Sequence, residues 1–208
     1  MAGMAAFMES HTSIAALLRA DRGDQLVVAR LLETYRPYLR LLARTSVDRA
    51  LKGKADPSDV VQEAMLRAAK NFTGFRGHSE GELVAWLRQL LVQSIIDLTR
   101  RYQTASRRVT RERSLNQMID QSSAALETFG RKAQSNADSL PSGAVAGVLV
   151  ANALAQLDND DREVISLRNF ERLEWSQVGE RMGRTGEAAR KLWTRAILRL
   201  RPIIEATL

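Results

Sequence analysis

The sequence predicts an all-α protein of two small helical domains joined by a flexible linker, with a helix-turn-helix in the C-terminal domain. Apolar residues recur with the helical period in several segments, and the strict alternation typical of a half-buried strand is missing. The periodicity lapses between residues 103 and 147. The expected organisation is a tail over 1–14, one domain over 15–102, a linker over 103–147 and a second domain over 148–208.

The first domain is expected to begin with helical segments that contain prolines at defined points. Residues 25–45 have apolar residues at helical spacing, and Pro37 predicts a kink or break there because proline lacks a backbone N–H. Asp56 and Pro57 then have the form of an N-cap followed by proline at the first helical position. The helix that they begin should end near Phe72. Its expected buried residues are Val60, Val61, Ala64, Met65 and Ala68.

A long third helix is predicted by Ser79 and Glu82, which have the spacing of a capping box. Its apolar stripe is Leu83, Trp86, Leu87, Leu90, Leu91, Ile95 and Leu98.

The segment 103–147 is rich in Ser, Ala, Gln and Asn, and is interpreted as a linker, either flexible or partly helical. A weak helical run extends from Leu115 to Ala133. As a random coil, about 45 residues would span roughly 35–40 Å, which would let the flanking domains lie well apart. Periodicity resumes near Val148, and Asp160 with Glu163 repeats the capping-box spacing.

Near the C-terminus, two amphipathic runs are separated by Gly183-Arg184-Thr185. Gly183 fits the position after a helix where a left-handed backbone is needed, and Thr185 is a suitable N-cap for the next helix. The apolar stripe of that helix is Ala189, Leu192, Trp193, Ala196, Ile197 and Leu200. Its polar face carries Glu187, Lys191, Thr194 and Arg195, with Arg190 and Arg199 on the flanks, and Leu198 also points to this side.

A short helix, a glycine turn and a longer helix with a basic face predict a helix-turn-helix, whose second helix enters the major groove of DNA. Lysine and arginine there can bind phosphate or guanine, and Glu187 can accept from cytosine. The alternative is the solvated basic face of an ordinary helical hairpin.

The charge balance also favours an anionic partner, either nucleic acid or a membrane surface. The net charge is +7 with a sequence pI of about 10.3. Residues 100–113 contain six arginines against one acid, which suits contact with a nucleic-acid backbone. Nearby aromatic residues can stack on splayed bases. Trp86 is expected in the core, whereas Phe72 and Phe75 flank a glycine in a predicted turn.

Several other classes have no support in the sequence. There is no cysteine, and His11 and His78 are far apart, so no metal site or cofactor is expected. No catalytic set or glycine-rich phosphate loop is found, and the protein is not expected to be an enzyme. The N-terminus lacks the features of a signal peptide, and no window is long and apolar enough for a membrane span. A cytoplasmic location without membrane insertion is expected.

Two blocks of the sequence resemble a known family. The segments DPSDVVQEAMLRAAKNFTGFRG and GELVAWLRQLLVQSIIDLTRR are similar to region two of bacterial RNA polymerase sigma factors. REVISLRNFERLEWSQVGERMGRTGEAARKLWTRAILRLR is similar to their region four. The blocks cover roughly two-thirds of the chain, and nothing resembles regions one and three. A chain with regions two and four alone resembles the extracytoplasmic-function (ECF) group of the sigma-70 family.

The resemblance implies partners and binding residues. The family binds core RNA polymerase, through the β′ clamp helices and the β flap, and promoter DNA; an anti-sigma factor is left open. The residues implied for β′ docking are Asp59, Gln62, Glu63 and Arg67. Those implied for melting and holding the minus-ten element are Phe75, Trp86, Arg88, Gln93, Arg100 and Arg101. Those implied for reading the minus-thirty-five element are Arg184, Thr185, Glu187, Arg190, Lys191, Thr194 and Arg195. The linker is implied to thread toward the RNA exit path.

This chain departs from the family pattern at two places. Val92-Gln93 stands where Arg-Asn is usual, and Gly179 replaces a common alanine, which is expected to loosen packing. A rival interpretation is a stand-alone helix-turn-helix regulator whose N-terminal domain dimerises or binds a signal. A third, an RNA-binding or nuclease accessory protein, would need a stacking or catalytic constellation that the sequence lacks.

Overall fold

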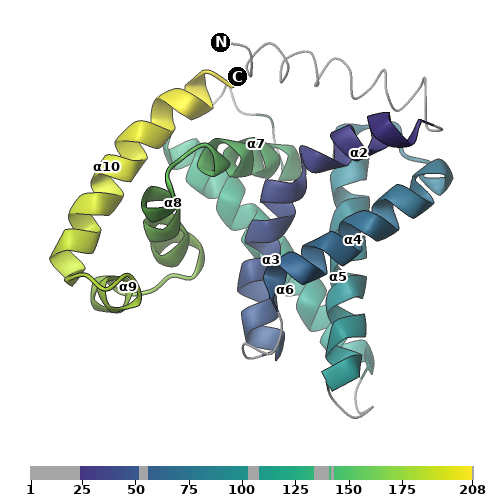
Figure 1. The fold of residues 1–208 in the computed structure, drawn as a ribbon, viewed down its shortest axis with the longest axis horizontal. Coiled ribbons are helices and arrows are strands. Elements are labelled where there is room, and N and C mark those ends of the chain that lie inside the picture. Colours follow the sequence, from purple (N-terminus) through teal and green to yellow (C-terminus); the bar gives the residue numbers. More distant parts are fainter. Residues whose placement is uncertain (1–23, 52–55, 103–107, 134–140, 142, 208) are drawn as a thin grey trace. The chain divides into compact units, whose positions relative to one another are not determined.

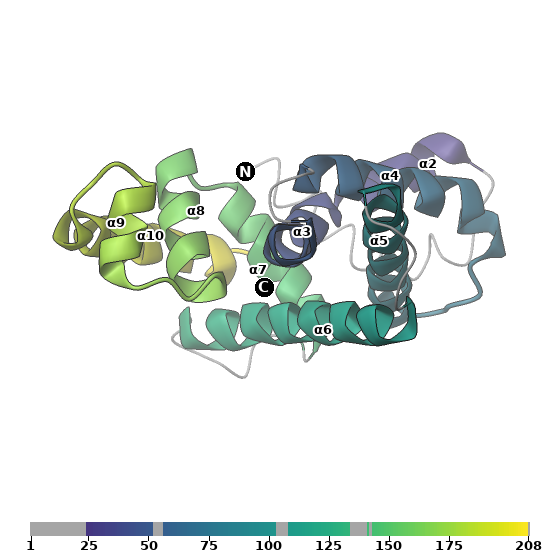
Figure 2. The ribbon, with the colours of Figure 1, turned by 90° about the horizontal axis from the view of Figure 1, so that it is seen from below.

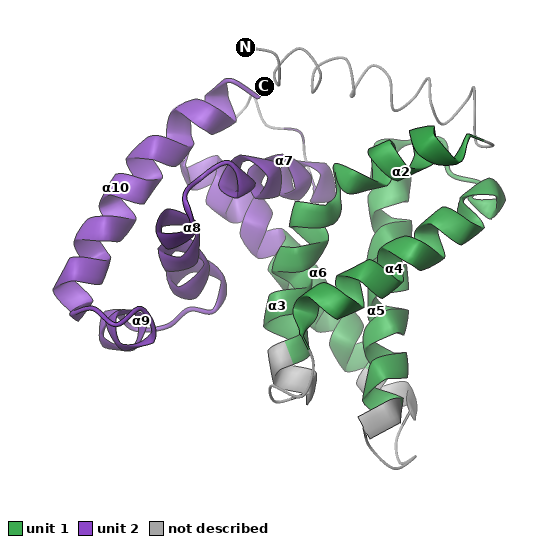
Figure 3. Ribbon diagram, viewed as in Figure 1, with its two compact units in different colours: residues 1–123 green, residues 124–208 purple. Residues whose placement is uncertain are grey.

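The computed structural model describes residues 24–51, 56–102, 108–133, 141 and 143–207. Over these residues the chain is helical and contains no strand, which confirms the predicted class (Figure 1). The chain forms two compact units that divide between Ser123 and Ala124, and each is described by itself (Figure 3).

Unit 1 is a bundle of helices. Its elements are α2 (Gln25–Glu33), α3 (Arg36–Leu51), α4 (Pro57–Asn71), η1 (Phe72–Gly74), α5 (Glu80–Tyr102) and the first part of α6 (Arg108–Ala133). Helix α4 packs on α2, α3 and α5. Within this unit, α3 and α5 lie between α4 and α6 (Figure 2). The largest fully buried side chains of the unit are Tyr35, Tyr38, Leu39, Leu42, Leu83, Leu87, Leu91, Ile95, Leu115 and Ile119.

The predicted helix starts in unit 1 are confirmed. Pro37 is the second residue of α3, and the chain breaks before it, between Glu33 and Arg36. Asp56 caps α4 by accepting a 2.7 Å hydrogen bond from the Ser58 backbone N–H.

The predicted capping box also forms at the start of α5. The Ser79 backbone N–H donates to Glu82 Oε2 at 3.0 Å, and the Glu82 backbone N–H donates to Ser79 Oγ at 3.3 Å. These bonds satisfy N–H groups that have no partner inside the helix.

Most of the predicted linker is helical rather than extended. The weak helical run from Leu115 to Ala133 lies inside α6, which begins earlier, at Arg108. Its buried apolar residues are Leu115, Ile119, Leu126, Phe129 and Ala133. Four-, seven- and three-residue spacings place these side chains on one helix face, so packing stabilises a segment whose other positions are small and polar.

Unit 2 is built around an apolar helix. Its elements after α6 are α7 (Ala144–Ala155), α8 (Asn159–Ile165), the π-helix η3 (Ser166–Phe170), α9 (Trp175–Arg181) and α10 (Gly186–Glu205). Helix α7 begins a few residues before the expected Val148 and is buried over most of its length. Helix α10 packs on α7, α8 and α9. None of the described helices is both long and apolar enough to cross a membrane.

The second predicted capping box, from Asp160 and Glu163, is wrong. Helix α8 has Asp158 at its N-cap, with no side-chain cap bond, and Asp160 lies inside the first turn. The Asp160 carboxylate instead accepts a hydrogen bond from Arg184 at 2.5 Å. This carboxylate therefore pairs with a residue 24 positions away instead of capping the helix.

Candidate nucleic-acid interface

The turn between α9 and α10 has the predicted geometry. Gly183 has a φ of 64°, in the left-handed region that favours glycine. Thr185 is the N-cap of α10, and its Oγ1 accepts a 3.1 Å hydrogen bond from the Ala188 backbone N–H. The turn is therefore fixed by one backbone requirement and one side-chain cap.

Gly179 brings the first helix of this motif very close to the turn. A Cβ atom at Gly179 would lie 2.7 Å from the Arg184 carbonyl oxygen and 2.7 Å from the Gly186 nitrogen. The Arg184 backbone N–H also donates to the Gly179 carbonyl at 2.8 Å. The expectation that glycine only loosens packing here is wrong, because its missing side chain permits this close backbone approach.

Helix α10 has one buried face and one exposed face. Its buried residues are Ala189, Leu192, Ala196, Leu200 and Ile204, whereas Trp193 and Ile197 are half-buried. The exposed residues of the predicted recognition surface are Arg184, Thr185, Glu187, Arg190, Lys191, Thr194 and Arg195. The structure therefore brings all these candidates together along the turn and the first half of α10.

Some exposed polar groups on this surface pair with one another. Lys191 Nζ lies 2.8 Å from Glu187 Oε1, and Thr194 Oγ1 donates to the Arg190 carbonyl at 3.1 Å. Arg184 is held by Asp160, as described above. Such exposed pairs contribute little stability and can be exchanged for phosphate contacts at low cost.

Farther along α10, Arg199 forms an ion pair with Asp161 of α8. Its Nη1 donates to Asp161 Oδ2 at 2.6 Å, and Asp161 is only 2% exposed. This hydrogen bond, followed by the charge of Asp161, raises the pKa of Arg199. Leu198, which the sequence places on the polar side of the helix, is 60% exposed.

A polar and aromatic hollow beside α9 was not predicted. It is lined by Arg168, Asn169, Arg172, Glu174, Trp175 and Trp193. Arg168 lies over the Trp175 ring at 4.7 Å, and Trp175 meets Trp193 edge-on with ring centroids 5.8 Å apart. The sequence signal was weak, because the π-helical turn that carries Arg168 and Asn169 is not visible in an ordinary helical pattern.

In unit 1, α4 has an open polar face. Its buried residues are the five that the sequence predicted. Asp59, Gln62 and Glu63 are exposed on the other side, and the structure adds Leu66, which is 49% exposed. The apolar residue was detectable from its spacing, since it lies one turn after Gln62 and Glu63.

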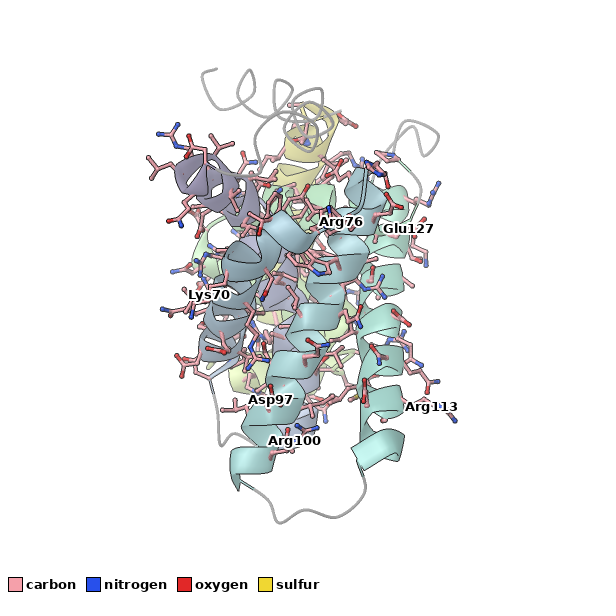
Figure 4. All side chains as sticks on the ribbon, turned by 90° about the vertical axis from the view of Figure 1, so that its right-hand side faces the viewer. Lys70, Arg76, Asp97, Arg100, Arg113 and Glu127 are labelled. Atoms are coloured by element: carbon pink, nitrogen blue, oxygen red, sulfur yellow. The ribbon has the colours of Figure 1, made fainter. Side chains whose placement is uncertain are left out.

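Arg67, the fourth predicted residue of this face, connects α4 to α5. Its Nη1 donates to Asp97 Oδ2 at 2.7 Å and its Nε donates to Glu63 Oε1 at 2.8 Å. The hydrogen bond to Asp97, and then that to Glu63, raises the pKa of Arg67. Arg100 also reaches Asp97, at 3.2 Å, and Figure 4 shows Asp97 and Arg100 near one end of α5.

The predicted minus-ten residues of α5 are only partly brought together. Trp86, Gln93 and Arg100 follow at seven-residue intervals and therefore lie along one stripe of the helix. Arg88 is turned about 200° from Trp86 and forms an ion pair with Asp120 of α6. The side chain of Arg101 lies outside the described residues.

Phe75 lies in an aromatic cluster rather than on an open surface. Its ring centroid is 5.0 Å from that of Trp86 and 6.1 Å from that of Phe72. Phe75 is 6% exposed and Phe72 is 2% exposed, whereas Trp86 is half-buried. This reverses the expected order, in which Trp86 was the core residue, because the turn folds the two phenylalanines inward. Val92, at the first departure from the family pattern, is also buried.

An exposed basic helix that follows a tight glycine turn defines a DNA-binding helix-turn-helix protein. Family models agree with this class: Sigma-70 region 2 matches residues 31–105, and Sigma-70, region 4 matches residues 153–202. The two matches together cover more than half of the chain, which belongs to the sigma-70 family of sigma factors. Membership implies binding to core RNA polymerase and to promoter DNA, with a role in promoter recognition. No curated protein and no solved structure matches the chain.

Proposed function

We propose that this sigma-70 family protein is an ECF-type transcription initiation factor of the cytoplasm. Its matches to regions 2 and 4 support that subgroup. The observation that carries the proposal is that each matched unit keeps one polar helix face uncovered, on α4 in unit 1 and on α10 in unit 2.

The α4 face is proposed to dock on the β′ clamp helices of the polymerase. Asp59, Gln62 and Glu63 give it an acidic and polar surface, and Leu66 supplies apolar area at its centre. Arg67 forms ion pairs with Asp97 and Glu63. It therefore contributes to the shape of this surface more than to its charge. A polar rim around an exposed apolar residue is typical of a protein interface.

The α5 stripe is proposed to engage the minus-ten element. Trp86, Gln93 and Arg100 would follow one DNA strand along the helix. Because Phe75 and Phe72 pack against Trp86, the cluster is proposed to form the wall of a base pocket rather than an open stacking platform.

The exposed face of α10 is proposed to read the minus-thirty-five element, and unit 2 is proposed to bind the β flap. Thr185 and Glu187 lie at the N-terminal end of α10, the part that reaches base edges in this motif. Arg190, Lys191 and Arg195 are placed for phosphate or guanine contacts.

The experiment that tests the function is run-off transcription with bacterial core polymerase, this protein and fragments of its own genome. New start sites that share upstream elements are the expected result. No starts, together with a symmetric footprint on duplex DNA by the free protein, would instead establish the stand-alone regulator, which binds without polymerase.

The docking face has its own test, which is co-purification with core polymerase. Glu63→Lys should prevent association with core polymerase, because it reverses one charge and breaks the pair with Arg67. Glu112→Lys is the matched control, since it makes the same charge change at an exposed position of α6. Normal polymerase association by Glu63→Lys would refute the α4 assignment.

A further inference from the structure

Arg172, in the turn between η3 and α9, has a backbone conformation that favours glycine. Its φ is 58°, and in the described part of the chain it is the only residue other than glycine with a positive φ. Residues with a Cβ rarely adopt this left-handed region, because the Cβ comes too close to the following carbonyl oxygen. Glycine adopts it without that clash, so the backbone alone does not explain an arginine here.

Hydrogen bonds on both sides of Arg172 hold the turn in this conformation. The backbone N–H of Glu171 donates to the Ser166 carbonyl at 3.1 Å, and that of Leu173 donates to the Leu167 carbonyl at 3.1 Å. Both bonds lead back to η3. The surrounding structure therefore imposes the positive φ, and strain imposed in this way is typical of positions where the side chain has a role.

The Arg172 side chain is open to a partner, whereas the other charged groups of the hollow beside α9 contact each other or the turn. Arg168 Nη1 donates to the Leu173 carbonyl at 2.8 Å, and its guanidinium lies over the Trp175 ring. Glu174 Oε2 lies 3.8 Å from Arg168 Nη1. Arg172 is exposed, and within the described residues its side chain forms no ion pair or hydrogen bond. An exposed, unpaired guanidinium suits an anionic partner.

The hollow lies next to the surface of α10 that is proposed to read DNA. Trp193, which lines the hollow with Arg172, is one turn from the exposed Arg190 on α10. The start of α9 packs against the start of α10, since a Cβ at Gly186 would lie 2.9 Å from the Trp175 carbonyl oxygen. Arg172 therefore lies beside the N-terminal half of α10, within unit 2. In a complex of this surface with duplex DNA, the anions that flank it are backbone phosphates.

We propose that Arg172 is a further DNA-binding residue of unit 2, which contacts a backbone phosphate beside the stretch of duplex that α10 reads. The contact rests on the proposed function of α10 and widens its footprint on the duplex. The arginine favours binding through its charge and disfavours folding through its backbone conformation. These two effects can be measured separately.

Three substitutions separate the charge of Arg172 from its backbone strain. Arg172→Lys keeps both, Arg172→Ala keeps the strain and removes the charge, and Arg172→Gly removes both. The full-length protein is titrated with a fluorescent duplex of mixed sequence at several low salt concentrations, since a phosphate contact does not depend on base sequence. Arg172→Ala and Arg172→Gly should each bind about three- to tenfold more weakly and lower the slope of log K against log salt by about 0.9, the value for one phosphate contact. Arg172→Lys should keep the wild-type slope.

Thermal unfolding of the same variants measures the strain. Arg172→Gly should unfold roughly 2–5 °C above Arg172→Ala, because alanine must still adopt the positive φ. Tryptophan fluorescence follows unit 2, which contains Trp175 and Trp193. The control is Lys132→Ala, which removes an exposed cation of α6 in the same unit and should change neither the slope nor the melting temperature.

An unchanged slope for Arg172→Ala would overturn the contact. If Lys191→Ala lowers the slope in the same titration, α10 remains the DNA surface and Arg172 is excluded from it. If Arg172→Ala instead weakens association with core polymerase at an unchanged DNA slope, the partner of Arg172 is an acidic protein surface. Equal melting temperatures of Arg172→Gly and Arg172→Ala would contradict the strain. A protein that starts no transcription but shows the Arg172 slope effect would contradict the proposed function and leave the contact supported.

Discussion

The indole Nε1 of Trp193 in α10 donates a 2.7 Å hydrogen bond to Asn169 Oδ1 in the π-helical turn η3. Both residues belong to unit 2 and are half-buried. Trp193 lies about 60° around α10 from the exposed Arg190, one turn away. The rotation of the basic face of α10 is therefore fixed in part by a hydrogen bond within unit 2.

Asn169→Ala should destabilise unit 2 by about 1–2 kcal/mol, because the half-buried indole N–H loses its acceptor. The measurement is urea unfolding followed by circular dichroism. The same substitution in a Trp193→Phe background should cost much less, since the donor is already gone. An equal loss in both backgrounds would show that the hydrogen bond contributes nothing.

Gly179→Ala should destabilise the helix-turn-helix by about 1–3 kcal/mol, the usual cost of forcing an extra carbon into a packed site. The new Cβ would meet turn backbone atoms 2.7 Å away, which cannot move aside as a flexible side chain can. Gly81→Ala is the control, since that glycine lies in α5 with open space around it. It should change stability by less than about 0.5 kcal/mol, so a clear loss in thermal unfolding for Gly179→Ala alone is the expected outcome.

The sequence predicted the helices whose signals are local. The caps at Asp56, Ser79 and Thr185 are read from neighbouring residues, and the helices after them have dense apolar stripes. Helix α6 was harder to recognise as a packed helix. Between Ile119 and Leu126 it has no buried apolar residue, and its hydroxyl groups at Ser122 and Ser123 bond to α3. Only tertiary contacts make these serines part of a packed surface.

Among the candidate sites, too, some follow from one helix alone and others depend on how helices pack. The basic face of α10 follows from periodicity along one helix and needs no partner. The ion pair between Arg67 and Asp97 joins residues 30 positions apart, so its existence depends on how α4 and α5 pack. The burial of Phe75 likewise depends on Phe72 and Trp86 meeting across a turn.

Glu82→Gln should remove a pH-dependent part of the stability of unit 1. The backbone N–H of His78, and then the Ser79 hydroxyl and backbone, lower the pKa of Glu82 below its usual 4.5. A lowered pKa in the folded state stabilises the protein above pH 4.5, and this contribution is lost as the pH falls through the lowered value. The wild type should therefore be more stable than Glu82→Gln at pH 7, by an amount that shrinks below pH 4.5. Thermal unfolding from pH 3 to 7 measures this, and a constant difference across the range would contradict it.

Lys191→Ala and Arg195→Ala should each weaken promoter binding without unfolding unit 2. Both side chains are exposed. In the ion pair of Lys191 with Glu187, the side chains are 73% and 77% exposed, respectively. Neither substitution should therefore cost more than about 0.5 kcal/mol of stability. If each side chain contacts one phosphate, the slope of log K against log salt should fall by about 0.9. The measurement is binding of the polymerase-bound protein to its mapped promoters at several salt concentrations. Lys132→Ala, which removes an exposed cation of α6, is the control and should leave the slope unchanged. Unchanged slopes in both variants would mean that unit 2 presents a different surface to DNA, because an exposed cation at a duplex phosphate cannot be removed without releasing fewer counterions.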